Sequence, residues 1–255
     1  MTRRKRCIPS ERERVQLTPR DLLILEAIAR CQFLSSLQVA RTYFTSHDRA
    51  LHRLRQLIDA RYLNATMLAS REPNLLSCTR RALDALVDDG VALGGVRLPS
   101  PVRASAVPHL VLTNDLRLYS ASLNAAGFGE LLEWNVAELG AARGNGLRPD
   151  ATVAIRLGRT EGTVYAEIDC GHEGADLQDK LNRYGKLLPR PTTELWIVAA
   201  GNAKRLDEVA RMCRRAQVDR STRLFAVADI NTRPTQPPVP KLFRKFEQQE
   251  HEDRG

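Results

Sequence analysis

The stretch RPDATVAIRLGRTEGTVYAEIDCGHE, residues 148–173, decides how the second half of the chain is interpreted. Two apolar runs with strand patterning are joined by a Gly-Arg-Thr-Glu-Gly turn. Acids stand at their ends: Asp150 opens the first run, and Glu167 and Asp169 close the second. A charge at a dry strand end is costly unless something pairs with it. These acids are therefore either paired structural acids or the ligands of a metal ion.

The sequence on both sides of this stretch predicts helices and strands in the order α-β-β-β-α-β-α-β. Apolar periodicity and turn residues place the boundaries. Helices are expected at 115–127, 175–188 and 202–216, and strands at 131–139, 149–157, 163–169, 193–200 and 222–229. The strand at 193–200 is nearly all apolar, which is typical of a strand covered on both faces.

The first half predicts a three-helix unit followed by two strands and a fourth helix. Thr18 is a good N-cap and Pro19 suits the first helical position, so a helix should begin there. Further helices are expected at 35–44 and 46–63, strands at 62–68 and 75–78, and a last helix at 79–90. A strand–turn–strand after three helices is the pattern of a winged helix-turn-helix domain.

The third helix carries side chains suited to DNA. Arg49, His52, Arg53 and Gln56 project opposite its apolar face, and arginine and glutamine can bond base edges in the major groove. Arg71, in the turn between the two strands, could reach a phosphate or the minor groove. The alternatives are an ordinary solvated helix face, or a winged helix used only for protein contact.

The charge of the chain supports a phosphate-rich partner for the first half. Residues 1–100 hold 17 lysines and arginines against 10 aspartates and glutamates, an excess of seven out of a net charge of +9. A basic surface of this kind attracts nucleic acid, although it also serves solubility. No apolar run is long enough to predict a membrane span or a signal peptide, so a cytoplasmic location without a membrane partner is expected.

Other chemistries lack their motifs. The five cysteines are scattered without a Cys-x-x-Cys pair, which argues against a disulfide framework or a zinc knuckle. No Gly-x-Ser-x-Gly elbow and no phosphate-binding Walker loop occurs. Composition shifts predict five parts: a disordered basic arm (1–16), the winged-helix domain (17–90), a linker (91–108), a second domain (109–230) and a flexible tail (231–255).

The second half resembles the PD-(D/E)xK nuclease core, so the expected fold class is α/β (α+β) with a restriction-endonuclease-like domain. The resemblance implies that Asp150 and Glu167 hold Mg²⁺ or Mn²⁺ and that a lysine stands two residues after the second acid. Asp169 occupies that position instead. Either Lys180 reaches back as a migrated lysine, or Asp169 is a further metal ligand, or the site is inactive and the fold only binds DNA.

The whole chain resembles the replication–relaxation family, which includes MobC-type plasmid mobilisation relaxases. The resemblance rests on LTPRDLLILEAIAR (17–30), HLVLTNDLRLY (109–119), LRPDA (147–151), AEIDCG (166–171) and KLNRYGKLL (180–188), in this order. It implies work on double-stranded DNA at a plasmid or element origin, with relaxosome proteins and oligomers as expected partners. Two functions stay open: a metal-dependent nickase with catalytic Asp150, Glu167, Asp169 and Lys180, or a non-catalytic accessory or transcriptional regulator.

Overall fold

The chain divides into two compact units, Met1–Ala104 and Ser105–Gly255, and each is described by itself. The computed structural model describes residues 15–67, 74–100, 102–136, 147–157, 160–171, 174–188 and 193–232. Nearly all of the predicted arm and tail, together with Arg71, lie outside these residues. No helix within these ranges is long and apolar enough to cross a membrane.

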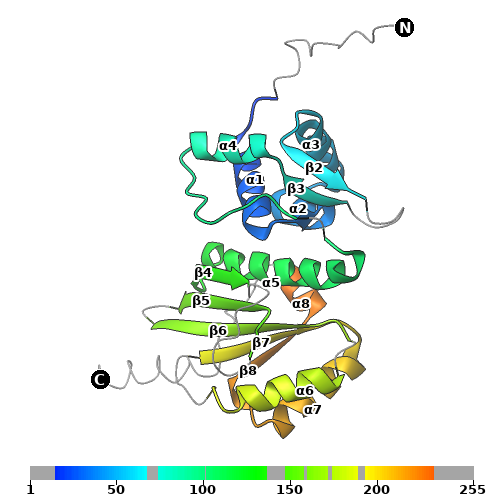
Figure 1. Ribbon diagram of the computed structural model, residues 1–255, viewed down its shortest axis with the longest axis vertical. Coiled ribbons are helices and arrows are strands. Elements are labelled where there is room, and N and C mark those ends of the chain that lie inside the picture. Colours follow the sequence, from blue (N-terminus) through cyan, green and yellow to red (C-terminus); the bar gives the residue numbers. More distant parts are fainter. Residues whose placement is uncertain are drawn as a thin grey trace, which may run out of the picture. The chain divides into compact units, whose positions relative to one another are not determined.

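In its described residues, unit 1 combines four α-helices with a three-stranded antiparallel sheet of order β1-β3-β2 (Figure 1). Its elements are α1 (Pro19–Cys31), β1 (Leu34–Ser35), α2 (Ser36–Tyr43), α3 (His47–Asp59), β2 (Leu63–Thr66), β3 (Leu75–Cys78) and α4 (Arg80–Asp88). The predicted helices and the strand pair are confirmed. The two-residue strand β1, which pairs with β3, was not predicted because it is too short to show a pattern.

Local capping explains where the helices of unit 1 begin. The Thr18 hydroxyl accepts from the Asp21 N–H at the start of α1, and the Asp21 carboxylate accepts from the Thr18 N–H in return. Ser35 and Gln38 form the same reciprocal box at α2, and Thr79 caps α4. Gly90 follows α4 with a φ of 86°, a left-handed conformation that glycine adopts without strain.

Unit 2 is built on a five-stranded mixed sheet of order β4-β5-β6-β7-β8. Its elements are η2 (Ala104–Ala106, at the unit boundary), α5 (Val107–Ala125), β4 (Glu130–Val136), β5 (Ala151–Leu157), β6 (Thr160–Asp169), α6 (Gly174–Tyr184), β7 (Thr193–Ala199), α7 (Ala203–Arg215), η3 (Asp219–Ser221), β8 (Thr222–Ala226) and α8 (Val227–Asn231). β4, β5 and β6 are antiparallel neighbours, whereas β6, β7 and β8 run parallel. The predicted order from α5 to β8 is confirmed. The strand predicted at 222–229 ends at Ala226, because the Asp229 carboxylate accepts from the Ala226 N–H and begins the short helix α8.

The helix α5 is longer than the sequence predicted. It begins at Val107, within the expected linker of 91–108, and not at Asp115. The stretch from Val111 to Asp115 is rich in β-branched and polar residues, which favour helices weakly, so its pattern gave no helical signal. Burial of Leu112 and Leu116 against the sheet overrides that weak local preference.

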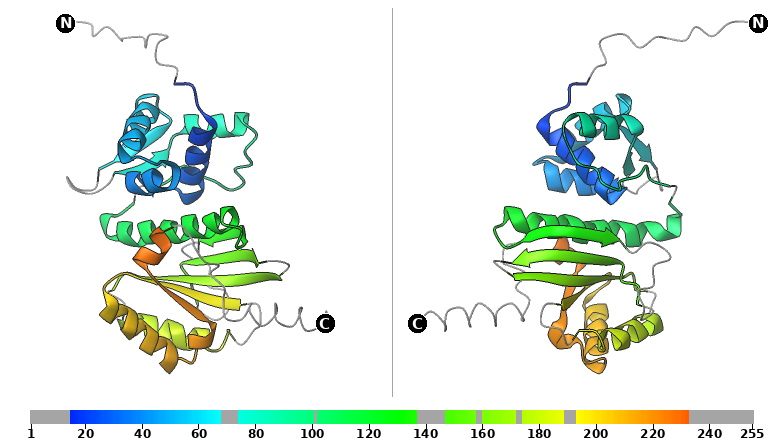
Figure 2. Two further views of the ribbon diagram at one scale, coloured as in Figure 1. Left: turned by 180° about the vertical axis from the view of Figure 1, so that it is seen from behind. Right: turned by 60° about the vertical axis from the view of Figure 1, so that its left-hand side comes forward.

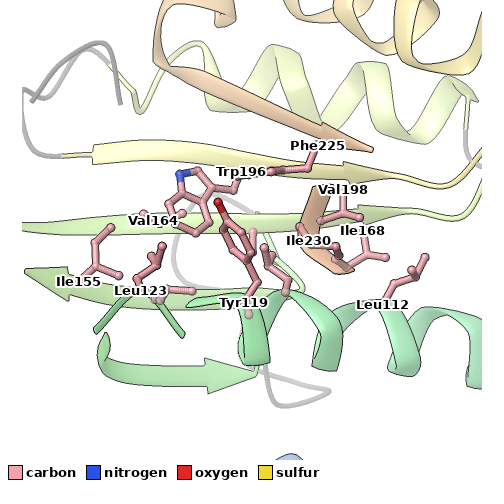
Figure 3. Close-up of a cluster of buried hydrophobic side chains, with 14 residues drawn as sticks. Leu112, Tyr119, Leu123, Ile155, Val164, Ile168, Trp196, Val198, Phe225 and Ile230 are labelled. Atoms are coloured by element: carbon pink, nitrogen blue, oxygen red, sulfur yellow. The ribbon is translucent and has the colours of Figure 1, made fainter. Parts of the chain in front are cut away.

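The two faces of the sheet carry different helices (Figure 2). α5 and α8 cover one face, where Tyr119 and Trp196 each meet the Phe225 ring edge-on, with centroids 5.6 and 5.5 Å away (Figure 3). α6 and α7 cover the other face, packing on alternate residues of β7. Every residue of β7 is buried, as expected for a strand covered on both faces. Side chains of β6 that do not face α5, including Glu167, therefore project toward α6 and α7.

Candidate active site and nucleic-acid surface

Two of the predicted acids meet where β5 begins beside the end of β6. The Asp150 N–H donates to the Ala166 carbonyl at 2.9 Å, and the Asp150 Oδ2 accepts from the Ile168 N–H at 2.7 Å. These bonds continue the antiparallel pairing of β5 and β6 by one residue, in which Ala151 lies opposite Ala166. Asp150 is thereby fixed next to Glu167, on the neighbouring strand.

Glu167 is a buried carboxylate with two specific donors. Only 2% of it is exposed, Lys180 Nζ lies 2.8 Å from Oε2, and the Tyr184 hydroxyl donates to Oε1 at 2.6 Å. Burial raises the pKa of Glu167 to about 7; the charge of Asp150 adds to the shift, and Lys180 and Tyr184 oppose it.

Asp150 is held by a histidine that the sequence did not connect with it. His109, in the first turn of α5, places Nε2 3.1 Å from Asp150 Oδ2. Burial alone would raise the pKa of Asp150, but the contact with His109, the charge of Lys180 and the Ile168 N–H together lower it below its ordinary value. Asp150 therefore remains an anion beside the more easily protonated Glu167.

Solvent reaches this group through Asp150, Lys180 and His109. Their side chains are 18%, 29% and 37% exposed, whereas Glu167 lies behind them. Both contacts of Asp150 fall on Oδ2. The arrangement therefore combines a partly open carboxylate, a buried carboxylate and an ammonium group, which is a set of charges able to meet a ligand from solvent.

Asp169 is not brought to this group, although it lies only two residues from Glu167. Arg205 of α7 holds it with two bonds, from Nε to Oδ2 at 2.7 Å and from Nη2 to Oδ1 at 2.8 Å. Asp169 is 1% exposed, and its Oδ1 also accepts from the Gly171 N–H. Within the described ranges no group of three or more His, Cys, Asp or Glu side chains is placed to hold a metal ion. The structure therefore gives Asp169 an internal partner and joins Lys180 to Glu167.

Tyr184 serves as an internal donor. It is 1% exposed on the inner face of α6, next to the Tyr165 ring at a centroid distance of 5.7 Å. Burial, reinforced by the negative charge of Glu167, raises the pKa of the Tyr184 hydroxyl far above its usual range. A buried phenol that keeps its proton is unsuited to act as a nucleophile toward DNA.

The exposed face of α3 displays Arg49 and His52, as predicted, but Arg53 has a second role. Arg53 lies at the border of the buried face and bonds both carboxylate oxygens of Asp21, at 3.0 and 2.6 Å. Two further N–H groups of Arg53 donate to the Gln56 side chain and the Gln16 carbonyl. Burial opposes ionisation of Asp21, yet hydrogen bonds from Arg53 and Thr18 leave its pKa below the ordinary value.

Three residues of these sites were not assigned by sequence reasoning, namely His109, Arg205 and Asp21. Each meets its partner across a long sequence separation, and such contacts leave no periodic signal. The position of Arg53 one step from the apolar stripe of α3 was the one available hint, since a border residue can reach a neighbouring helix.

Comparison with known proteins identifies the family of the chain. No curated protein matches it, and no solved structure does either. The family model described as Replication-relaxation matches residues 25–194, which run from α1 through the candidate site to the start of β7. The match spans roughly two thirds of the sequence and includes Asp150, Glu167 and Lys180. The chain therefore belongs to the replication-relaxation family.

Proposed function

We propose that this protein binds double-stranded DNA in plasmid replication or relaxation, and that unit 2 cleaves a phosphodiester bond with the help of a divalent metal ion. The family supports the process, because its model covers most of both units. One observation carries the chemistry: Lys180 Nζ lies 2.8 Å from Glu167 Oε2, beside Asp150 on the adjoining strand. Two acids and a lysine at paired strand ends are the functional set of PD-(D/E)xK nucleases.

Unit 1 is proposed to be a winged helix-turn-helix domain. The three helices α1–α3, the β2–β3 pair and the capped α4 support this architecture. α3 would enter the major groove with Arg49 and His52 leading, because these side chains are exposed. Arg53 would position the helix by its bonds to Asp21, with Gln56 beside it.

Unit 2 is proposed to be a PD-(D/E)xK-type domain whose lysine has moved from strand to helix. The antiparallel β4-β5-β6 strands followed by parallel β7 and β8, with α5 on one face and α6 and α7 on the other, support this assignment. Asp169 occupies the usual lysine position, but Arg205 neutralises it, and Lys180 supplies an ammonium group from α6. The positive charge would then act beside Glu167 with no contribution from Asp169.

The donor set fits Mg²⁺ or Mn²⁺. These hard ions take carboxylate oxygens, and Mg²⁺ commonly uses one or two carboxylates with water and substrate phosphate as the remaining ligands. Asp150 and Glu167 would hold the ion, and the chemistry it would supply when bound is activation of a water and polarisation of the scissile phosphate. Lys180 would stabilise negative charge that develops on the phosphate, and Tyr184 would keep Glu167 in its orientation.

A second candidate function is favoured by a different observation. Both oxygens of Glu167 and Oδ2 of Asp150 already have donors from the chain, so the site is also stable as a closed structural network. On this interpretation the protein is a non-catalytic DNA-binding accessory or regulator that retains a nuclease-like fold. The two candidates differ in whether the acids bind a metal ion.

Calorimetric titration with Mn²⁺ separates these candidates. We expect the wild type to bind one Mn²⁺ and Asp150→Asn to lose this binding. Asp179→Asn is the matched control, because Asp179 is an exposed acid adjacent to Lys180 in sequence and the substitution makes the same change in charge. Absence of binding in the wild type, or equal binding by Asp150→Asn, would favour the non-catalytic candidate.

A further inference from the structure

A second basic surface lies in unit 2, on α6, α7 and the residues that follow them. α6 and α7 lie on the same face of the sheet, and the strands that they connect run parallel. Each helix returns from the end of one strand to the start of the next, so both helices finish at the same end of the sheet (Figure 1). Positively charged residues at the C-terminal ends of α6 and α7 therefore lie at the same end of the sheet.

The contact between the two helix ends is close. A methyl group on Gly185, the residue after α6, would lie 2.7 Å from the carbonyl oxygen of Ala216, the residue after α7. The short helix η3 then packs against α7 and β7. This geometry brings together five exposed cations, here called the helix-end cluster: Lys186, Arg211, Arg214, Arg215 and Arg220.

The helix-end cluster has little compensating negative charge. Residues 182–188 and 211–220 contain a single acid, Asp219. Earlier in α7, by contrast, Arg205 is paired with both Asp169 and Glu208. None of the five cluster residues forms an ion pair with another residue that the structure describes. Like charges held together in this way repel one another until an anion binds.

Favourable interaction of positive charges with the helix dipole explains only part of the helix-end cluster. Arg214 and Arg215 in the last turn of α7 interact favourably with its negative end. Lys186, two residues past the end of α6, lies near a negative helix end as well, but Arg220 lies outside both helices and their dipoles do not account for it. The predominance of arginine favours a phosphate ligand, because the guanidinium fork bonds phosphate oxygens in pairs.

We propose that the helix-end cluster is a second DNA contact, which binds the phosphate backbone of double-stranded DNA without reading its bases. The proposal rests on the proposed DNA-binding function and adds a DNA contact in unit 2 to the one proposed for unit 1. Phosphate contacts give affinity that is independent of sequence and falls steeply with salt. The contact would hold duplex on unit 2 whatever sequence α3 selects.

The test is fluorescence anisotropy with the full chain and a short mixed-sequence duplex, repeated over a range of salt concentrations. The cluster variant is Lys186→Gln/Arg214→Gln/Arg215→Gln. Its matched control, Arg97→Gln/Arg103→Gln/Lys204→Gln, removes three exposed cations elsewhere. Each lost phosphate contact lowers the slope of log K against log salt by about 0.9, so the cluster variant should lose roughly two to three units of slope. The control should keep the slope of the wild type.

Four outcomes decide whether the proposal stands. Equal slopes and affinities for the cluster variant and the control would overturn the proposal and leave an acidic protein as the alternative partner. A charge-preserving variant, Lys186→Arg/Arg214→Lys/Arg215→Lys, should retain binding; if it also loses binding, folding is the cause and the proposal fails. If the wild type binds no duplex even at low salt, the proposed function itself fails. If Arg49→Ala/His52→Ala weakens binding and the cluster variant does not, only unit 1 contacts DNA and the proposal is wrong.

Discussion

Replacing Arg53 with alanine should destabilise unit 1 far more than replacing its neighbour Arg49. Asp21 is completely buried, and Arg53 supplies two charge-assisted hydrogen bonds to its carboxylate. Removing one partner of a buried pair typically costs about 3–5 kcal/mol. The N–H and hydroxyl of Thr18 would still bond Asp21, so we expect the lower end, ~3 kcal/mol.

Thermal unfolding of the full chain, followed by circular dichroism and calorimetry, measures this effect. For a domain near 100 residues, 1 kcal/mol shifts Tm by about 4–8 °C, so Arg53→Ala should lower the unit 1 transition by roughly 12–24 °C. Arg49→Ala is the control, because Arg49 is exposed and its loss should stay within about 0.5 kcal/mol. If Arg53→Ala melts like Arg49→Ala, the pair with Asp21 does not stabilise the fold and the reasoning is wrong.

The pH dependence of that deficit gives a second check on the same pair. The pKa of Asp21 is lowered in the folded state, so its stabilising contribution is present above the unfolded pKa of about 3.9. The contribution is lost as the pH falls through the folded pKa. The difference in Tm between the wild type and Arg53→Ala should therefore shrink in acid. A difference that stays constant down to strongly acidic pH would contradict the ionic origin of the effect.

Two further predictions concern unit 2. Burial raises the pKa of Glu194 to about 7, and the hydrogen bond from the Trp196 side chain and the charge of Arg223 partly oppose this rise. Protonated Glu194 therefore contributes stability that is fully present below pH 4.5 and is lost as the pH rises through about 7. Glu194→Gln should then be more stable than the wild type at pH 8 by about 3 kcal/mol in urea unfolding, and an unchanged pH profile would refute this. Gly185→Ala should lower the free energy of unfolding by about 1–3 kcal/mol, because the added methyl group meets the Ala216 carbonyl. Gly94→Ala is the control and should not change stability, because nothing lies within 4 Å of its added methyl group. Equal melting temperatures of the two variants would contradict the close contact between the helix ends.

Elements with strong local signals were predicted well. Thr18, Ser35 and Thr79 cap helices through bonds to residues three positions ahead, so the sequence alone marks these starts. The alternation of strands and helices from β4 to β8 follows from periodicity in the same way. The start of α5 was not predicted correctly, because residues 107–114 have no strong helical pattern. They are helical because they pack on the sheet.

The candidate site was only half visible in the sequence. Asp150 and Glu167 were found because strand pairing fixes which residues face one another across a short hairpin. The side chains that contact the acids come from helices far away in the sequence. His109 precedes Asp150 by 41 positions, and Arg205 follows Asp169 by 36. Lys180 was one of three alternatives left open by the missing lysine, and helix packing places it on Glu167. Side-chain pairing across packed layers depends on three-dimensional geometry that periodicity does not record.

Nicking of a supercoiled plasmid that carries the origin of its own element, with Mn²⁺ present, shows whether Asp150, Glu167 and Lys180 form a cleavage site. We expect the wild type and Asp179→Asn to convert the plasmid to open circles. Asp150→Asn and Lys180→Met should leave the plasmid supercoiled while still binding duplex DNA. A wild type that never nicks the plasmid, or an Asp150→Asn variant that nicks it as fast as the wild type, would contradict the claim that Asp150, Glu167 and Lys180 form a cleavage site.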